Sequence, residues 1–220
     1  MAVLLTGGAG YIGSHTCVVL LENGYDVVVV DNLCNSSQES LRRVEKITGQ
    51  PVAFYRSDLR DETAMNDIFR RHSIDAVIHF AGLKSVAESV DQPLAYYENN
   101  INSTLVLCAV MQKHEVKNFV FSSSATVYGN PETVPIDENA PVRPFNPYGR
   151  TKLFIEEILK KIYMRPIIHG ILPCYGISTR WAPPQRTHRR RSRGYSEQPD
   201  ALSARWPWEN CRNASLRKRL

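Results

Sequence analysis

Residues 6–15 read TGGAGYIGSH, and this glycine-rich stretch decides the fold because of the segments on either side of it. A short apolar run, Val3–Thr6, predicts a strand before it, and Ile12–Glu22 predicts a helix after it. The glycines satisfy both the G-x-x-G-x-x-G and the G-x-G-x-x-G spacing. Glycine lets the backbone turn tightly and approach a pyrophosphate, whose charge then rests on the helix N-terminus. The stretch therefore predicts a dinucleotide-binding turn.

An acidic residue lies at the position where a dinucleotide-binding turn requires one for the ribose. Asp31 closes a second apolar strand, Asp26–Val30, and lies 18 positions beyond Gly13. Its carboxylate can accept both ribose hydroxyls of an adenosine, and no Lys or Arg between residues 26 and 39 could receive a 2′-phosphate, which favours NAD over NADP. Asp58, just after the third predicted strand, either contacts the adenine amino group or is a solvated turn residue.

Strands and helices alternate through the first 160 residues, a pattern typical of βαβ units on a parallel sheet. We expect an α/β fold, a doubly wound parallel sheet of five strands of the Rossmann type, with residues 1–162 as an NAD-binding domain that includes a catalytic helix. The predicted strands are Val3–Thr6, Asp26–Val30, Val52–Tyr55, Ala76–Phe80 and Phe119–Ser122, and the predicted helices are Ile12–Glu22, Ser40–Thr48, Glu62–Arg71, Pro93–His114 and Tyr148–Tyr163.

The two parts of the chain differ in charge and composition. Residues 1–160 hold 14 basic and 19 acidic side chains, whereas residues 161–220 hold 13 basic and three acidic ones. The second part also contains six of the 13 prolines and all three tryptophans. A boundary between ordinary domains does not need such a break. We therefore interpret residues 163–220 as an aberrant, disordered basic tail that replaces a second domain.

Cysteine usage and hydropathy limit the cellular setting. Five cysteines, with no two-residue spacing and no clustered histidine, indicate reduced thiols and no metal site. No run approaches the roughly 18 apolar residues of a membrane helix, and the first strand leads straight into glycines instead of a signal-peptide core. We expect a cytoplasmic protein that does not associate with a membrane.

Tyr148 and Lys152 are four positions apart in the last predicted helix, so both project from one face. A cation within ~4–6 Å favours a phenolate, and we expect Lys152 to lower the pKa of Tyr148 from its usual value of about 10. The strand before this helix ends in Ser122–Gly129 (SSSATVYG), where a serine can hydrogen-bond a reacting hydroxyl. Alone, the pair would equally suit an exposed helix face.

The combination of glycine turn, serine, tyrosine and lysine resembles the extended short-chain dehydrogenase/reductase family over about 160 of the 220 residues. Long stretches are similar to the UDP-glucose 4-epimerase branch of this family. They are Thr6–His15 (TGGAGYIGSH), Asp31–Asn35 (DNLCN), His79–Ser89 (HFAGLKSVAES), Tyr96–Thr104 (YYENNINST) and Ser122–Gly129 (SSSATVYG).

The resemblance implies a tightly bound NAD, a UDP-sugar substrate and, for full-length members, a homodimer. Tyr148 and Ser124 would face the sugar 4-hydroxyl, with Lys152 on the nicotinamide ribose. Tyr148 would accept the hydroxyl proton while the C4 hydride passes to NAD, so that UDP-galactose and UDP-glucose interconvert through a 4-ketosugar. The residues implied along NAD are Gly7, Gly10, Tyr11, Ile12, Gly13, Asp31, Asn32, Asn35, Asp58, Leu59, Phe80, Ala81, Gly82, Lys84, Asn99, Tyr148 and Lys152. Without the family pattern, Lys84 would be a solvated loop lysine.

Three other functions compete with this one. Nucleotide-sugar 4,6-dehydratases share the glycines and the Tyr and Lys pair, but they carry Asp-Glu where this chain has Ala125-Thr126, so elimination has no evident catalyst. A non-catalytic NAD-binding module would have no need of Tyr148 and Lys152. Nucleic-acid binding by the basic run at 186–193 is opposed by the acidic first domain and by the lack of a recognised binding fold, so we expect no nucleic-acid partner.

Members of the family continue past the catalytic helix with a sixth strand, an Arg-Tyr-Phe-Asn-Pro segment and a smaller domain that grips the UDP, and we find none of these after residue 163. We hypothesise that the tail is an epimerase region read out of frame. Regrouped codons of Cys174–Pro183 permit LRYFNPVGA, and those of Gly194–Leu202, in the other frame, permit GIPNNLMPY. The DNA sequence tests this hypothesis, which predicts a poorly soluble, inactive chain.

Overall fold

The computed structural model describes residues 1–137, 139–163 and 174–175. The chain divides into two compact units, Met1–Arg180 and Trp181–Leu220, and every described residue belongs to the first. Most of the tail predicted at 163–220 therefore lies outside the described residues. Within the described part, none of the helices combines the length and the apolar composition that crossing a membrane requires.

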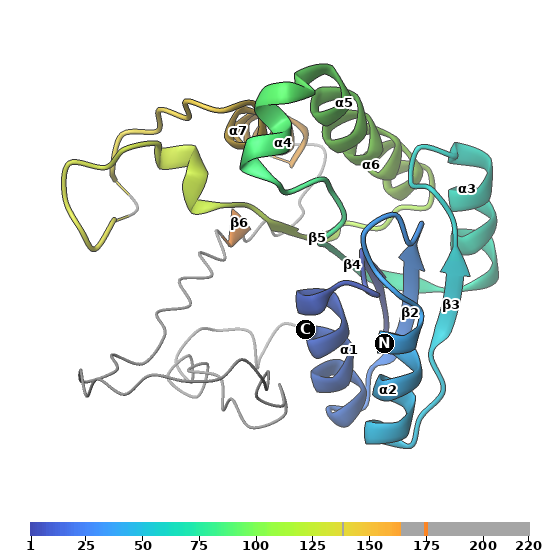
Figure 1. Ribbon diagram of the computed structural model, residues 1–220. Coiled ribbons are helices and arrows are strands. Elements are labelled where there is room, and N and C mark those ends of the chain that lie inside the picture. Colours follow the sequence, from blue (N-terminus) through green and yellow to red (C-terminus); the bar gives the residue numbers. More distant parts are fainter. Residues whose placement is uncertain (138, 164–173, 176–220) are drawn as a thin grey trace, which may run out of the picture. The chain divides into compact units, whose positions relative to one another are not determined.

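Parallel strands form one sheet in the order β3-β2-β1-β4-β5-β6 (Figure 1). The order reverses beside β1, which is flanked by β2 on one side and β4 on the other, so the fold is the predicted doubly wound α/β sheet of the Rossmann type. Sheets of this kind bind their ligands at the switch point, beyond the carboxyl ends of the strands. The strands are β1 Ala2–Thr6, β2 Asp26–Asp31, β3 Ala53–Arg56, β4 Ile74–His79, β5 Asn118–Ser122 and β6 Cys174–Tyr175.

The sixth strand corrects the sequence analysis, which expected five strands and none after residue 163. β6 pairs in parallel with β5, with Phe121 opposite Cys174 and Ser122 opposite Tyr175. A strand of two residues is too short to show a hydrophobic alternation, and its pairing depends on the free edge of β5. For that reason the sequence pattern gives no sign of it.

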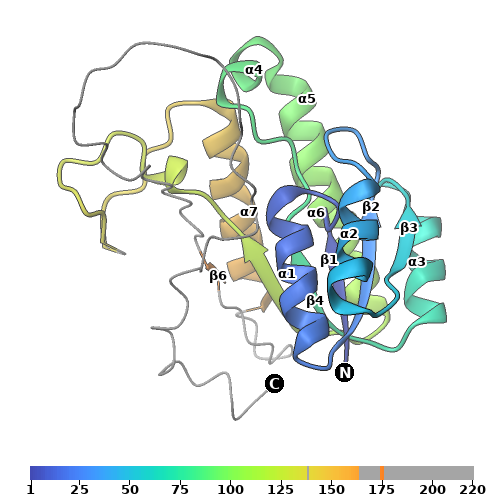
Figure 2. The same cartoon turned by 60° about the horizontal axis from the view of Figure 1, so that its bottom comes forward.

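Helices cover both faces of the sheet (Figure 2). On one face, α1 (Tyr11–Glu22) and α2 (Glu39–Thr48) pack on the side chains of Leu5 and Val29. On the other face, α3 (Glu62–Arg71), α6 (Ser103–Lys113) and α7 (Pro147–Tyr163) pack on a cluster that includes Leu4 and Phe121. Neighbouring residues of one strand thus serve opposite faces, which explains why the interior residues of β1 and β2, Val3–Leu5 and Val27–Val30, are all apolar.

The single helix predicted at 93–114 is interrupted. It begins as α5 (Pro93–Tyr97), widens into the π-helical turn η1 (Glu98–Asn102) and continues as α6, while a short helix that we had not predicted, α4 (Val86–Asp91), precedes it. A π turn breaks the usual ladder of helical hydrogen bonds, and such turns are frequent at functional sites. A short 3-10 turn, η2 (Ala125–Tyr128), follows β5.

Candidate active site

At two positions of the glycine turn, a residue larger than glycine would clash with the backbone. A Cβ on Gly7, whose φ is 69°, would lie 2.6 Å from the backbone nitrogen of Ala81, in the segment after β4. A Cβ on Gly13 would lie 2.4 Å from the carbonyl oxygen of Gly7. Gly10 is the N-cap of α1 and has no side chain to cover the first amides of the helix. The turn is therefore held by close backbone packing, and it leaves the first N–H groups of α1 without a side-chain cap, the arrangement that binds a phosphate at a helix N-terminus.

Asp31 lies beside this turn at the end of β2 and is buried. One carboxylate oxygen accepts a hydrogen bond from the backbone nitrogen of Ala9 at 3.0 Å. The other accepts from the backbone nitrogen of Leu33 at 2.9 Å and from the hydroxyl of Ser36 at 2.8 Å. These contacts fix the carboxylate between the glycine turn and the loop after β2, the place expected for a ribose partner.

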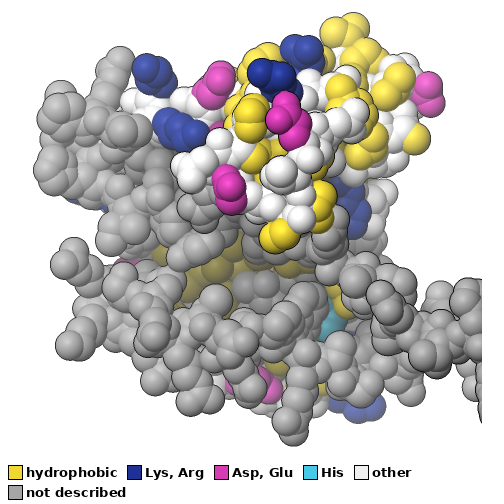
Figure 3. Space-filling view, turned by 90° about the vertical axis from the view of Figure 1, so that its left-hand side faces the viewer, with side chains coloured by type: hydrophobic (Ala, Val, Ile, Leu, Met, Phe, Trp, Pro, Cys, Tyr) yellow, Lys and Arg dark blue, Asp and Glu magenta, His cyan; other side chains and the backbone are white. Residues whose placement is uncertain are grey.

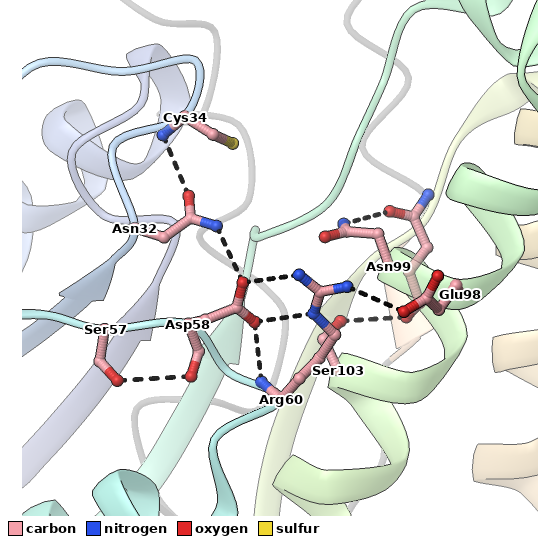
Figure 4. A network of polar contacts seen from close by, with 9 residues as sticks. Asn32, Cys34, Ser57, Asp58, Arg60, Glu98, Asn99 and Ser103 are labelled. Atoms are coloured by element: carbon pink, nitrogen blue, oxygen red, sulfur yellow. Dashed lines mark hydrogen bonds and ion pairs between the residues drawn. The ribbon is translucent and has the colours of Figure 1, made fainter.

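Asp58, after β3, is held by four donors (Figure 4). Arg60 donates from its backbone nitrogen at 2.9 Å, from Nε at 3.0 Å and from Nη2 at 2.9 Å, and Asn32 donates from Nδ2 at 3.3 Å. The hydrogen bonds from Arg60 lower the pKa of Asp58 to about 2. Nη1 of Arg60 also lies 3.3 Å from the carboxylate of Glu98 on η1. Arg60, which the sequence analysis did not single out, thus links the loop after β3 to the π turn.

The other implied cofactor residues differ in exposure. Tyr11, Asn35 and Lys84 are exposed, and the ring of Tyr11 meets the ring of His15 edge to face at 4.8 Å. Leu59 is buried in the core on the α3 side of the sheet, so only its backbone can face a ligand. The half-buried members are Ile12, Phe80, Ala81, Gly82 and Asn99.

At the far end of the site, the first turn of α7 packs directly on η2. A Cβ on Gly149 would lie 2.8 Å from the carbonyl oxygen of Thr126, so only glycine allows this approach. The side chain of Asn146 accepts the backbone N–H of Gly149 at 2.7 Å and so caps the helix. This packing places Tyr148 next to Ser124.

The hydroxyl of Ser124 is oriented by Thr126. Its oxygen accepts hydrogen bonds from the backbone nitrogen of Thr126 at 3.2 Å and from the Thr126 hydroxyl at 2.9 Å. Since both acceptor positions are then filled, the Ser124 proton is left to donate. Tyr148 receives this side-chain hydrogen bond, which acts to lower the pKa of the phenol.

Lys152 is buried one turn further along α7. Its Nζ donates to the backbone carbonyl of Ser122 at 2.9 Å and lies 4.7 Å from the centroid of the Phe121 ring and 5.9 Å from that of Tyr148. Burial lowers the pKa of Lys152 to about 8, against the opposing effect of Glu156. The predicted shared face of Tyr148 and Lys152 is therefore present in the helix.

The expected direction of the Tyr148 pKa is wrong for the chain without cofactor. Burial raises the pKa of Tyr148, and the hydrogen bond from Ser124 offsets only part of that effect. Desolvation disfavours the charged phenolate, and a helical spacing of four positions contains no information about burial. A positive group near the phenol is needed to turn Tyr148 into a base at neutral pH.

The sequence analysis missed a set of buried polar side chains behind the site. His79, Asn100 and Thr151 are at most 2% exposed, and each makes hydrogen bonds to residues distant in sequence. The feature of the sequence that could have revealed these residues is a polar side chain within a segment whose other residues are mostly hydrophobic. Among the described residues, Cys17, Cys34 and Cys108 are free thiols, and no group of His, Cys, Asp and Glu is arranged to hold a metal ion.

Comparison with known proteins identifies a family and several similar proteins. The profile of the NAD dependent epimerase/dehydratase family matches residues 3–188. The chain is 59% identical over 163 residues to the UDP-glucose 4-epimerase of Bacillus subtilis, which covers 74% of this chain and 48% of the relative. It is 54% identical over 167 residues to the UDP-glucose 4-epimerase of Mus musculus, covering 73% and 48%. The chain spans about half the length of the curated relatives it matches.

Solved structures show the same similarity. A UDP-glucose 4-epimerase from Bifidobacterium longum, in complex with NAD⁺ and UDP, is 56% identical with a TM-score of 0.73, and the match covers 74% of this chain and 49% of that one. The UDP-Glc/GlcNAc 4-epimerase of Campylobacter jejuni is 37% identical with a TM-score of 0.72, covering 78% and 52%.

Proposed function

Because the chain belongs to the NAD dependent epimerase/dehydratase family, we propose that residues 1–162 are the NAD-binding and catalytic domain of a UDP-glucose 4-epimerase. The observation that carries this proposal is the juxtaposition of Ser124, Tyr148 and Lys152 at the carboxyl edge of the sheet, together with a glycine turn that leaves the N-terminus of α1 uncapped by a side chain. The relatives named above support the substrate, and the complex of the Bifidobacterium longum enzyme supports the cofactor.

The residues of this chain fit NAD. Glycine at positions 7 and 13 permits the close backbone packing of the turn, whose amides would hold the pyrophosphate, and Asp31 would accept the ribose hydroxyls. Asp58 would accept the adenine amino group by exchanging its longest partner, Asn32 at 3.3 Å. When bound, NAD supplies the hydride acceptor and donor of the reaction.

Tyr148 is the proton acceptor for the sugar 4-hydroxyl. Burial raises the pKa of the phenol, and a positively charged group bound close to it, such as an oxidised nicotinamide, would favour the phenolate. Lys152 Nζ lies 5.9 Å from the centroid of the Tyr148 ring. Ser124, whose proton is directed outward by Thr126, donates a hydrogen bond to the phenolate or to the sugar oxygen. Tyr148 returns the proton when the 4-keto group is reduced on its opposite face.

The test uses both the 220-residue chain and a hybrid enzyme, defined as residues 1–163 of this chain followed by the corresponding remainder of the Bacillus subtilis relative. We expect calorimetry on the 220-residue chain to give NAD at least about tenfold tighter binding than NADP, a difference of ~1.4 kcal/mol. We expect the hybrid enzyme to convert UDP-galactose to UDP-glucose. A 4-keto-6-deoxy product would indicate a dehydratase, and NAD binding without turnover would indicate a non-catalytic module.

We also propose that the whole protein forms a homodimer through α4, α5 and α7. Val90 is 61% exposed, Leu94 is 82% exposed, and Phe154 on α7 stacks on Tyr97 at 6.2 Å while remaining partly exposed. Hydrophobic side chains gather at the upper right of the face drawn in Figure 3. Such exposed apolar side chains suit an interface. Sedimentation of the hybrid enzyme should give a dimer, and Leu94→Glu should give a monomer.

A further inference from the structure

One buried amide lies between the cofactor segment and the catalytic helix. Asn100 belongs to the π turn η1 and is 2% exposed. Its Oδ1 accepts the backbone N–H of Leu83 at 2.8 Å and the side-chain N–H of Asn99 at 3.0 Å. Its Nδ2 donates to the carbonyl of Leu83 at 3.0 Å and to the hydroxyl of Thr151 at 3.1 Å. All four hydrogen-bonding positions of the amide are therefore used, which fixes its orientation.

Of the three residues bound by the Asn100 side chain, Leu83 and Thr151 belong to different parts of the site. Leu83 lies within residues 80–84, the segment that touches the glycine turn and contains several of the implied NAD contacts. Thr151 lies between Tyr148 and Lys152 in sequence, and its hydroxyl donates to the carbonyl of Tyr148 at 2.7 Å. Asn100 thus reaches the backbone of Tyr148 through a single intervening hydroxyl.

A second set of hydrogen bonds holds the backbone carbonyl of Asn100. The hydroxyl of Thr104 donates to the carbonyl of Asn100 at 2.8 Å, so Thr104 can only accept from His79 Nε2, which is 3.1 Å away. A neutral His79 then carries its proton on Nε2, and its Nδ1 accepts from the hydroxyl of Thr6 at 2.6 Å. Thr6 is the last residue of β1, directly before the glycine turn.

We propose that Asn100 is a positioning residue that fixes the distance between residues 80–84, which pack on the glycine turn and include several implied NAD contacts, and the phenol of Tyr148. The proposal rests on the proposed function, because it assumes that NAD occupies the edge of the sheet. Asn100 touches neither reacting group. It acts through Leu83 on one side and through Thr151 on the other.

The distance is measurable through the titration of Tyr148. A positively charged nicotinamide near the phenol favours the phenolate, so NAD binding should lower the pKa of Tyr148 by an amount that depends on their separation. The titration is followed by ultraviolet difference spectroscopy on the 220-residue chain. Since the chain has ten tyrosines, the spectrum of Tyr148→Phe is subtracted.

The decisive variant is Thr151→Val, which keeps the shape of the side chain but removes the hydroxyl between Asn100 and Tyr148. We expect it to bind NAD within about threefold of the parent chain, since the Leu83 contacts remain. We also expect NAD to lower the pKa of Tyr148 by less than about half as much as in the parent. Thr151→Ser, which keeps the hydroxyl, should restore most of the effect.

Two further variants separate positioning from stability. Thr48→Val makes the same chemical change on α2, where the threonine hydroxyl donates to the carbonyl of Val44 at 2.9 Å, and it should leave the NAD-dependent pKa change intact. Asn100→Ala should weaken NAD binding as well, because it releases Leu83. If neither the parent chain nor the hybrid enzyme binds NAD, the proposed function is wrong. If the parent binds NAD but Thr151→Val shows an unchanged effect on Tyr148, or if Thr151→Ser fails to restore a lost effect, the positioning role of Asn100 is wrong.

Discussion

The two ends of the site are built in different ways. At the nucleotide end, the contact of Ala9 with Asp31 joins residues 22 positions apart, and glycines whose missing side chains make room for the backbone form the turn. At the catalytic end, Asn100 meets Thr151 across 51 positions, and the polar network behind it extends through His79 to Thr6, 73 positions from His79. The first end depends on close backbone packing and the second on a buried polar network. Substitutions should therefore affect them through different mechanisms.

The largest effect is expected at the catalytic end, from Tyr148→Phe. The change removes the proton acceptor and almost no volume, so in the hybrid enzyme kcat should fall by about 10²- to 10⁴-fold while NAD stays bound. Steady-state rates with UDP-galactose and calorimetry with NAD measure the two quantities separately. Near-normal turnover by the variant would contradict the assignment of Tyr148 as the base.

The nucleotide end provides a matched pair of glycines. Gly7 and Gly49 both have a φ of 69°, but a Cβ on Gly49 meets nothing within 4 Å, whereas one on Gly7 meets the backbone of Ala81. Gly49→Ala should cost ~1–2 kcal/mol of unfolding free energy for the left-handed backbone alone. Gly7→Ala should cost a further ~1–3 kcal/mol for the clash and should weaken NAD binding.

Urea unfolding of the 220-residue chain and its two variants measures the difference between these glycines. Calorimetry with NAD measures the consequence for the turn, which only Gly7→Ala should disturb. Equal losses of stability in the two variants would show that the close approach of residues 7 and 81 does not constrain the turn.

The contrast between the two ends also explains what the sequence could predict. The glycine turn, Asp31 and the pair Tyr148 and Lys152 are readable because each depends on spacing within one or two neighbouring elements. Asn100 lies inside a stretch that resembles the family, yet no spacing in the sequence indicates that its partners are Leu83 and Thr151. Contacts of that kind exist only after the sheet has formed.

Two further expectations failed for physical reasons of the same type. The pKa of Tyr148 moved upward because burial, which is a tertiary property, outweighs the hydrogen bond from Ser124. The helix expected at 93–114 is interrupted by the π turn, which contains Asn100 and thus the tertiary contacts of Asn100 with Leu83 and Thr151. Helical periodicity alone could not distinguish this turn from a regular helix.

Acid should weaken the network at the catalytic end. Burial lowers the pKa of His79 to about 3, with a smaller contribution from Lys152, whereas an unfolded histidine titrates near 6.5. Between these values the unfolded chain binds a proton that the folded chain does not. The stability that His79 contributes is thus complete above a pH of about 6.5 and is lost as the pH falls toward about 3, by ~1.4 kcal/mol per pH unit.

Urea unfolding of the 220-residue chain at several pH values tests this dependence. His79→Gln removes the titrating group. Between pH values of about 4 and 6, the slope of its unfolding free energy against pH should therefore be smaller than that of the parent chain by the equivalent of about one bound proton. Parallel pH dependences for the two proteins would mean that His79 is not held neutral in the fold.

The smallest effect that we expect concerns the orientation of Ser124. Thr126→Val keeps the backbone donor to the Ser124 hydroxyl and the shape of the side chain but removes the hydroxyl donor at 2.9 Å. The Ser124 proton is then free to rotate away from Tyr148, at a cost of about one ordinary hydrogen bond, ~1 kcal/mol. In the hybrid enzyme, kcat should fall by about fivefold, whereas KM for UDP-galactose should stay unchanged because ground-state binding is retained.

The conservative variant Thr126→Ser retains the donor and should keep near-normal activity. Thr16→Val removes a comparable hydroxyl from α1, where it donates to the carbonyl of Ile12 at 3.0 Å, and serves as a control for the chemical change itself. An equal loss in Thr126→Ser and Thr126→Val would assign the effect to packing. A loss confined to Thr126→Val would show that the catalytic end depends on the direction of a single serine proton.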